Sequence, residues 1–356
     1  MKAVLIIAGG SGERFWPLST QDKPKQLLKI FTNKPLIRET VERILPLVPR
    51  ERIFICTNIK LGEKIRAEVL DLPEENIILE PVGRDTASAI AYGALVIQEK
   101  FHKEKIELIV LPSDHLIKKE EEFRQVLEIA CQEARHSGVI VTLGIKPTRA
   151  ETAYGYIEVK DSNISLNEIY RVRRFREKPN LEVAEKYLNS GNYLWNSGIF
   201  IFAIETIFKN FQVLMEEHWE ILERIKKKLR ENPREYKNIP KIIEEDFMEF
   251  EKISIDFGIM EYSKNIRVIP VDMEWSDLGS YNAFEEIFSS DENGNITREN
   301  AVFYESSNNI VVGENIHLLG VQGLVVVRGE EGNILVAKRD RIQDIKKLLE
   351  FKKNML

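Results

Sequence analysis

The sequence predicts an α/β fold, in which a mixed, mainly parallel sheet is flanked by helices and followed by a small β module. Three observations lead to this prediction. Short apolar runs alternate with helix-period segments in the first half, a glycine-rich loop follows the first run, and the composition changes near residue 291. Such alternation favours parallel strands joined by right-handed crossovers, with ligands at the carboxyl ends of the strands.

The first half supplies the regular part of this pattern. Pro35 opens a helix with apolar residues at a 3.6-residue period, and Asp85 is expected to cap an alanine-rich helix. Further helices are expected near residues 62–70 and 120–136. The predicted strands are residues 4–7, 53–56, 77–79, 108–111 and 139–143.

The second half is mixed. Strands at 156–159, 172–176 and 198–202 are interleaved with helices near 181–189 and 213–231, and no flexible linker separates them from the first half. We therefore expect them to extend the same sheet. After residue 291, short apolar runs alternate with Asn and Gly, which indicates a small β module, and residues 341–353 have the period of a closing amphipathic helix. The expected domains are residues 1–286 and 287–356.

The composition excludes several classes of protein. A hydrophobic content of 43%, a charged content of 30% and a net charge of −6 describe a soluble protein and argue against a nucleic-acid binder. Two cysteines are too few for a disulfide framework. No apolar stretch approaches the roughly 18 residues of a membrane span, and the start does not read as a signal peptide. We expect a cytoplasmic protein without a membrane partner.

The loop AGGSGERFWPLSTQDKPKQ, residues 8–26, has the composition of a triphosphate cradle. Glycines let backbone N–H groups approach an anion, and Arg14 and Lys25 add fixed positive charge. A dinucleotide-binding turn is excluded because Phe15 stands at the third glycine position, and no Gly-Lys-Ser/Thr triplet of a P-loop occurs. For the glycines alone, a simple turn with flanking surface charges is the alternative.

The form GGSGERFWPLS followed by KPKQ resembles the signature of the sugar-nucleotide pyrophosphorylases, a family of nucleotidyltransferases. The resemblance extends over roughly residues 1–340. It implies the nucleotide-diphospho-sugar transferase fold and a C-terminal module similar to a short left-handed β-helix, through which homodimers form. A hairpin cap on a monomer is the alternative. The most similar members join GTP to mannose 1-phosphate, so the implied products are GDP-mannose and pyrophosphate.

The resemblance also implies a nucleotide and metal site. Asp114, in LPSDH, would alone be a turn or cap residue, but it matches the family's metal-binding segment, with Asp277 in WSDLGSY as the second carboxylate. Mg²⁺ is the expected cofactor, since it takes one or two carboxylates together with phosphate oxygens. Lys25 would stabilise charge at the α-phosphate. The nucleotide-binding residues implied are Ala8, Gly9, Gly10, Ser11, Gly12, Arg14, Lys25, Glu80, Gly83, Asp85 and Ser113.

Two further segments are implied to bind the base and the sugar. The loop EPVGRDT, residues 80–86, would lie against the nucleobase, and whether Glu80, Asp85 or backbone groups read guanine is left open. Lys178, in FREKP, would align the attacking sugar phosphate as the third catalytic cation beside Arg14 and Lys25. The implied sugar phosphate-binding residues are Gly155, Glu177, Lys178, Asn196 and Asp256, each of which alone would be a turn or core residue.

Three rival functions remain at this point. One is the same chemistry with another sugar 1-phosphate or nucleotide. A second is a bifunctional enzyme with isomerase activity, for which the chain leaves no room. The third is a catalytically silent subunit that senses GDP-mannose. Such a subunit should have lost the charged ligands, whereas Lys25, Lys178, Asp114 and Asp277 are all present.

Overall fold

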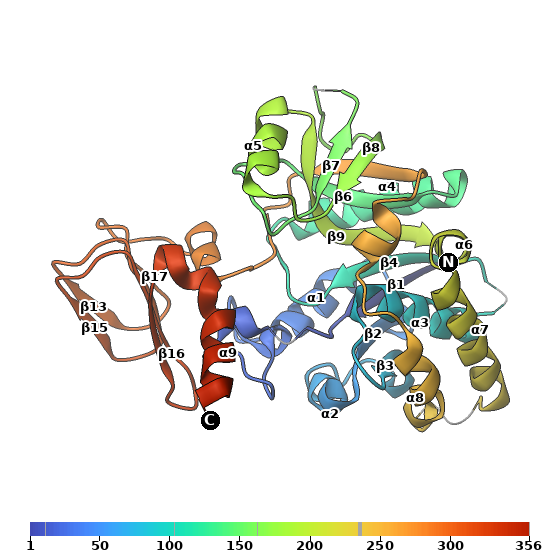
Figure 1. Cartoon of the computed structure of the whole chain (residues 1–356), viewed down its shortest axis with the longest axis horizontal. Helices are drawn as coiled ribbons and strands as arrows, with labels where there is room; N and C mark the ends of the chain where they lie inside the picture. The colour runs from blue at the N-terminus through green and yellow to red at the C-terminus, as the bar shows by residue number, and fades with distance from the viewer. Residues whose placement is uncertain (11, 103, 162, 234–236, 356) are drawn as a thin grey trace. The chain divides into compact units, whose positions relative to one another are not determined.

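The computed structural model describes residues 1–10, 12–102, 104–161, 163–233 and 237–355 (Figure 1). Contacts between residues divide the chain into two compact units. The first comprises Met1–Gly9, Thr40–Ser113 and Ile117–Trp275, and the second comprises Gly10–Glu39, Asp114–Leu116 and Ser276–Leu356. Most of the glycine loop therefore belongs to the same unit as the C-terminal module.

A nine-stranded mixed sheet forms the centre of the first unit. Its strand order is β3-β2-β1-β4-β9-β6-β10-β8-β7. The neighbours among β1 to β4 are parallel, whereas β9 runs antiparallel to β4, β6 and β7. The strands are β1 Lys2–Ile7, β2 Ile53–Asn58, β3 Ile77–Glu80, β4 Glu107–Pro112, β6 Ile140–Ile145, β7 Tyr156–Val159, β8 Tyr170–Arg176, β9 Tyr193–Ala203 and β10 Ile266–Val271. The expected extension of one sheet into the second half is confirmed.

The apolar runs form strands because both faces of this sheet are covered. In β1, Ala3 and Leu5 pack into a core shared with helix α3 (Asp85–Lys100), while Val4 and Ile6 point to the opposite face, and all four are fully buried. A strand buried on both faces needs a continuous apolar run rather than alternation. Gly93 of α3 permits the close approach of helix to strand, because a Cβ there would lie 2.5 Å from a methyl carbon of Leu5.

The helices agree with the expected pattern in the first half and differ in the second. They are α1 Leu36–Ile44, α2 Ile59–Glu68, α3 Asp85–Lys100, α4 Glu120–Ser137, α5 Leu181–Ser190, α6 Ile204–Leu214, α7 Glu216–Glu231 and α8 Ile239–Glu249. The helix expected near 213–231 corresponds to α7, which begins just after Met215, whereas α6 and α8 were not expected. None of the described helices combines the length and apolarity needed to traverse a bilayer.

The expected cap of α3 was wrong. Arg84 rather than Asp85 occupies the cap position, and no side chain caps the helix there. Asp85 is the first helical residue, with φ of 71°, and its carboxylate accepts a hydrogen bond from the Thr86 N–H at 2.7 Å. The carboxylate thus bonds to the next residue, not to the second or third N–H of the turn that a capping side chain satisfies.

The second unit stacks short strands around its own core. Strands β12, β14 and β16 are parallel, β17 is antiparallel to β16, and β13 pairs in parallel with β15. Phe15 joins this core, where its ring lies 5.0 Å from that of Tyr281, whose hydroxyl donates to the Phe15 carbonyl at 2.7 Å. The elements are β12 Ile296–Thr297, β13 Ala301–Tyr304, β14 Ile310–Val312, β15 Ile316–Leu319, β16 Leu324–Arg328, β17 Ile334–Lys338 and α9 Ile345–Met355; two further short strands are β5 Leu116–Ile117 and β11 Trp275–Ser276.

Candidate active site

A pocket of about 320 Å³ in the second unit brings the predicted phosphate and metal residues together. Its walls come from the glycine loop, from the segment after β4, from the segment after β11 and from helix α9. The lining residues are Gly10, Gly12, Glu13, Arg14, Phe15, Lys25, Asp114, His115, Asp277, Leu278, Gly279 and Lys346. Ser11, also predicted here, lies outside the described residues.

Lys25 connects the two aspartate segments of this pocket. Its ammonium group lies 2.9 Å from a carboxylate oxygen of Asp114 and donates to the carbonyl oxygen of Asp277 at 2.6 Å. The side chain is only 9% exposed. Gly12 makes room for this residue, because at φ 63° a Cβ would lie 2.5 Å from the Lys25 backbone nitrogen. The glycine is therefore required for packing as well as for backbone conformation.

Asp114 is held in its ionised form. Burial alone would raise the pKa of its carboxyl, but the nearby charge of Lys25, followed by that of His115, brings the pKa below its usual range. Asp277 folds back on its own backbone, where its carboxylate accepts from the Gly279 N–H at 2.9 Å. The pocket thus presents an ionised carboxylate and a second aspartate.

These donors fit a divalent cation of the Mg²⁺ type. Two carboxylates line one pocket, and the remaining coordination positions of Mg²⁺ are ordinarily filled by water and phosphate oxygens. Gly10, which lines the same pocket, leaves space there, since an added Cβ would meet no atom of the described residues beyond its chain neighbours within 4 Å. Across the described part of the chain, no group of three or more His, Cys, Asp or Glu could hold a metal by itself. The Mg²⁺ site therefore stays a prediction, in which the two aspartates supply part of the ligands and the phosphate oxygens of the substrate supply others.

The predicted base-binding residues lie in the first unit. Glu80 is 4% exposed, and its Oε1 has no hydrogen-bond partner among the described residues. Burial and then the charge of Asp85 raise the pKa of Glu80 to about 8. A Cβ on Gly9 would lie 3.7 Å from Glu80 Oε2, so this carboxyl lies beside the glycine backbone. Gly83 is open, because a Cβ there would meet no atom within 4 Å in the described part of the chain, its own neighbours in sequence aside.

The backbones of two other predicted nucleotide ligands are engaged within the fold. The Ala8 carbonyl accepts from the Thr57 hydroxyl at 2.9 Å. Ser113 is buried, donates its N–H to the Ile7 carbonyl at 3.2 Å, and accepts at its own carbonyl from the Thr40 hydroxyl at 3.3 Å. These contacts tie the ends of β1 and β4 to their neighbours.

The five predicted sugar-binding residues also form one cluster in the first unit. The Asn196 N–H donates to the Gly155 carbonyl at 2.8 Å, and the Lys178 ammonium lies 2.8 Å from a Glu177 carboxylate oxygen. The other Glu177 oxygen is buried and, among the described residues, has no partner. A side chain at position 155 would collide with that oxygen, so glycine keeps the carboxylate in place.

Asn196 organises the polar part of the cluster. Its amide nitrogen donates to Asp256 at 3.0 Å, and its amide oxygen accepts from the Thr142 hydroxyl at 3.2 Å. Burial first, and then the charge of Glu177, raise the pKa of Asp256 to about 7. Thr142 was missed from the sequence because a buried threonine inside strand β6 carries no motif.

An aromatic group beside this cluster was also not expected. The ring of Tyr154 lies 5.1 Å from that of Trp195 and 5.5 Å from that of Trp275. Trp195 precedes Asn196 and Tyr154 precedes Gly155, so the rings and the polar groups come from the same short segments. The position of these aromatic residues directly before predicted sugar ligands was the sequence signal that could have predicted the aromatic group.

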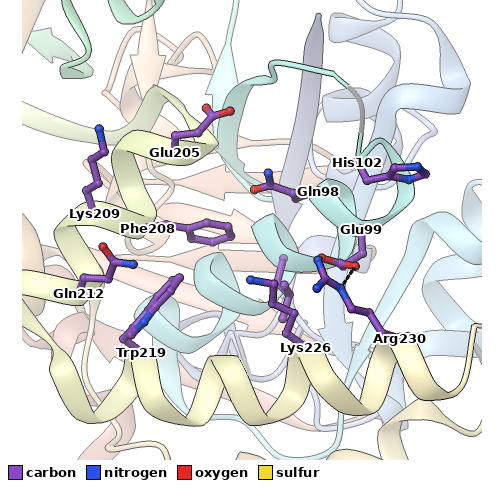
Figure 2. A pocket seen from close by; sticks show the side chains of 11 residues that line it. Gln98, Glu99, His102, Glu205, Phe208, Lys209, Gln212, Trp219, Lys226 and Arg230 are labelled. Carbon is purple, nitrogen blue, oxygen red and sulfur yellow. Dashed lines mark hydrogen bonds and ion pairs between the residues drawn. The ribbon is translucent and has the colours of Figure 1, made fainter.

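A different pocket, of about 370 Å³, is lined by none of the predicted site residues that the structure describes. It lies in the first unit, and Figure 2 shows helix residues around it, with the ion pair between Glu99 and Arg230 at 2.7 Å. Phe208 and Trp219 form its apolar wall, with ring centroids 5.5 Å apart. Its chemistry gives no indication of catalysis.

Two family models match the chain. The Nucleotidyl transferase model covers residues 3–294, and the MannoseP isomerase/GMP-like beta-helix domain model covers residues 299–351. The chain therefore belongs to the nucleotidyl transferase family.

Individual relatives are more specific. The chain is 34% identical to the mannose-1-phosphate guanylyltransferase RfbM of Salmonella typhimurium, over 98% of this chain and 72% of that protein. It is 37% identical to a mannose-1-phosphate guanylyltransferase of Klebsiella pneumoniae, over 98% and 73%. A crystal structure described as mannose-1-phosphate geranyltransferase from Thermus thermophilus matches with a TM-score of 0.86 and 33% identity, covering 99% of both chains. The fold and the family expected from the glycine loop are confirmed.

Proposed function

We propose that this chain makes GDP-mannose and pyrophosphate from GTP and α-D-mannose 1-phosphate. The observation that carries the proposal is the Lys25–Asp114 pair in a glycine-lined pocket, found in a chain with the relatives named above. A phosphate oxygen of the sugar attacks the α-phosphorus of GTP in line. The new bond forms there, the bond between the α-phosphorus and the bridging oxygen breaks, and pyrophosphate leaves. The attacking oxygen is already ionised at neutral pH, so no general base is needed.

The residues of the second unit are assigned to the triphosphate. The glycine loop and Arg14 hold the β- and γ-phosphates, and Lys25 stabilises the charge that develops at the α-phosphate. Positioning and charge stabilisation carry most of the catalysis in phosphoryl and nucleotidyl transfer. Lys25 suits this role because it is nearly buried and held by two partners, so little reorganisation is needed during the reaction.

Asp114 and Asp277 are assigned to Mg²⁺. When bound, the cation supplies Lewis-acid neutralisation of charge on the α-phosphate and the leaving group. The supporting observations are the shared pocket and the depressed pKa of Asp114, which keeps that donor ionised.

The residues of the first unit are assigned to the base and the sugar. Lys178 aligns the sugar phosphate, and Gly155, Glu177, Asn196 and Asp256 contact the sugar. The support is their hydrogen-bonded cluster, in which one buried Glu177 oxygen has no partner among the described residues. Glu80, whose Oε1 has no partner among the residues that the structure describes, is the better supported of the candidate readers of guanine.

We also propose a cytoplasmic homodimer that forms through the C-terminal module. Cys56 and Cys131 are both buried free thiols, as expected in a reducing compartment. The module exposes large apolar side chains, among them Tyr304 and Leu319. Exposed apolar groups concentrated on one small module favour association. Sedimentation of the protein and of Leu319→Lys tests this, and a wild-type monomer would contradict it.

The activity is tested by pairing the four nucleoside triphosphates with mannose, glucose, fucose and N-acetylglucosamine 1-phosphates and measuring pyrophosphate release. GTP with mannose 1-phosphate should give the highest kcat/KM. Preference for UTP or dTTP with glucose 1-phosphate would overturn the proposed substrates. GDP-mannose binding without pyrophosphate release from any pair would indicate a silent sensor instead.

A further inference from the structure

Helix α9 contributes a lysine to the pocket of the glycine loop. Lys346 lines the same pocket as Gly10, Arg14, Lys25 and Asp114, although nothing in the sequence of this helix distinguishes it from a surface lysine. We propose that Lys346 binds the β- and γ-phosphates of the nucleotide, a role that deepens the proposed function and rests on it.

The helix is fixed against the segment that carries Arg14. Ile345, next to Lys346, is 3% exposed and belongs to the apolar core that contains Phe15, and Leu349 packs on that core one turn later. Near the end of the helix, the Lys352 ammonium lies 5.5 Å from the centre of the Trp16 ring. Three contacts along α9 therefore set the position of Lys346 at the pocket.

The charge of Lys346 is available to a ligand. Within the described residues its side chain makes no hydrogen bond or ion pair, whereas the ammonium groups of Lys347 and Lys25 lie 2.8 Å from Asp344 and 2.9 Å from Asp114. A flexible lysine that lines a pocket without a protein carboxylate can turn its ammonium group to a phosphate, where it acts as a point charge.

The pocket needs such a cation. Its lining contains three carboxylates, of which Asp114 and Asp277 are assigned to Mg²⁺, whereas Glu13 has no cation assigned to it and repels a triphosphate. Lys25 is already engaged by Asp114, which leaves Arg14 and Lys346 to attract the anionic end of the ligand. Because Lys346 shares its wall with the glycine loop and not with the base-binding residues, its contact should depend on the β- and γ-phosphates.

The test compares Lys346→Ala with Lys347→Ala in the full-length protein. Titration calorimetry measures the affinities for GTP, GMP and inorganic tripolyphosphate, and steady-state assays measure KM for each substrate. Because a hydrogen bond to a charged group contributes substantially to binding free energy, Lys346→Ala should weaken the binding of GTP and of tripolyphosphate about tenfold. GMP binding, KM for mannose 1-phosphate and Tm should stay unchanged, Lys346→Arg should restore most of the affinity, and Lys347→Ala should resemble wild type.

Equal GTP affinity of Lys346→Ala and Lys347→Ala would overturn the proposal, as would an equal loss of GMP and GTP binding. The proposed function would be contradicted if the wild-type protein made no GDP-mannose. If, in the same experiments, tripolyphosphate affinity fell in Lys346→Ala and not in Lys347→Ala, the assignment of Lys346 to phosphate binding would still be supported. The two failures are thereby distinguished.

Discussion

The pocket of the second unit and the sugar cluster of the first unit both hold an aspartate near a lysine, with opposite results. In the pocket, Lys25 pairs directly with Asp114, and the pKa of that carboxyl falls although burial opposes the change. In the cluster, Lys178 pairs with Glu177 instead, and burial with the charge of Glu177 raises the pKa of Asp256 to about 7.

Burial raises the pKa of both carboxyls, so the charges around each one account for the opposite directions. A carboxylate that stays ionised suits cations and a highly charged substrate. A carboxyl that titrates near neutrality beside an amide suits hydrogen bonds with uncharged hydroxyl groups. The two regions therefore match the two ends of the proposed reaction, the triphosphate and the sugar.

The largest expected effect tests the cationic side of this comparison. Lys25→Ala should lower kcat for pyrophosphate release about 10²- to 10³-fold, as expected for the loss of one preorganised electrostatic donor. Lys23→Ala is the matched control, since Lys23 belongs to the same loop and pairs with the exposed Glu330. Near wild-type kcat in a folded Lys25→Ala protein would contradict the role assigned to Lys25.

The second prediction concerns the ionised carboxylate. Asp114→Asn should raise the Mg²⁺ concentration for half-maximal activity by about tenfold or more, because the loss of one anionic oxygen weakens a site that has few protein ligands. Glu13→Gln is the control, because Glu13 lines the same pocket and is not assigned to the metal. If both variants show the same Mg²⁺ requirement as wild type, Asp114 is not a ligand.

The third prediction concerns the titrating carboxyl. Between about pH 4 and pH 7 the folded protein keeps a proton on Asp256 that the unfolded chain has lost, so the free energy of unfolding decreases as the pH rises through this window. Asp256→Asn removes that dependence. Denaturant titrations should show the variant about 1–3 kcal/mol more stable than wild type at pH 8 and nearly equal to it at pH 4.

Asp272→Asn provides a control of opposite sign. A hydrogen bond from Lys119 lowers the pKa of Asp272, so this carboxylate stabilises the fold above the unfolded pKa, and its replacement should reduce stability at pH 8 by less than about 1 kcal/mol. A stability change of the same sign in both variants would contradict the comparison.

The smallest expected effects come from alanine substitutions at two glycines of the loop, Gly10 and Gly12, which should change different properties. Gly10→Ala should leave Tm unchanged and raise KM for GTP several-fold, because its Cβ meets no atom of the described residues beyond its chain neighbours within 4 Å and would enter ligand space. Gly12→Ala should lower Tm, since its Cβ would overlap the Lys25 backbone at a left-handed φ. Unchanged GTP binding in Gly10→Ala would place the triphosphate elsewhere.

Local patterns in the sequence predicted most of the sheet. Runs such as residues 4–7 and 108–111 form strands because they are buried on both faces, and their order along the chain gives the parallel first half. The antiparallel direction of β9 and the existence of α8 were not predictable in this way, because both depend on packing between distant segments. The prediction that Asp85 caps α3 was wrong because Asp85 adopts a positive φ, which cannot be inferred from the amino-acid composition.

The candidate site divides similarly. Motifs predicted Lys25, Asp114 and Asp277, and the structure places all three at one pocket. The sequence did not predict that Lys25 would pair with Asp114, nor that Lys346 would reach the same pocket. These are long-range contacts, and a lysine on an amphipathic helix is ordinarily a solvated residue. The raised pKa of Asp256 was not predictable from the sequence either, because it depends on Lys178 forming its ion pair with Glu177.

The second unit is built from three stretches of chain that lie far apart in sequence, Gly10–Glu39, Asp114–Leu116 and Ser276–Leu356. During synthesis on the ribosome, the glycine loop emerges more than 230 residues before its apolar neighbours in Ser276–Leu356. Contacts of such long sequence separation form slowly, because a large loop must close first. A nascent chain would therefore acquire its central sheet before its triphosphate pocket, and the loop would lack its apolar neighbours until the segment Ser276–Leu356 has been made.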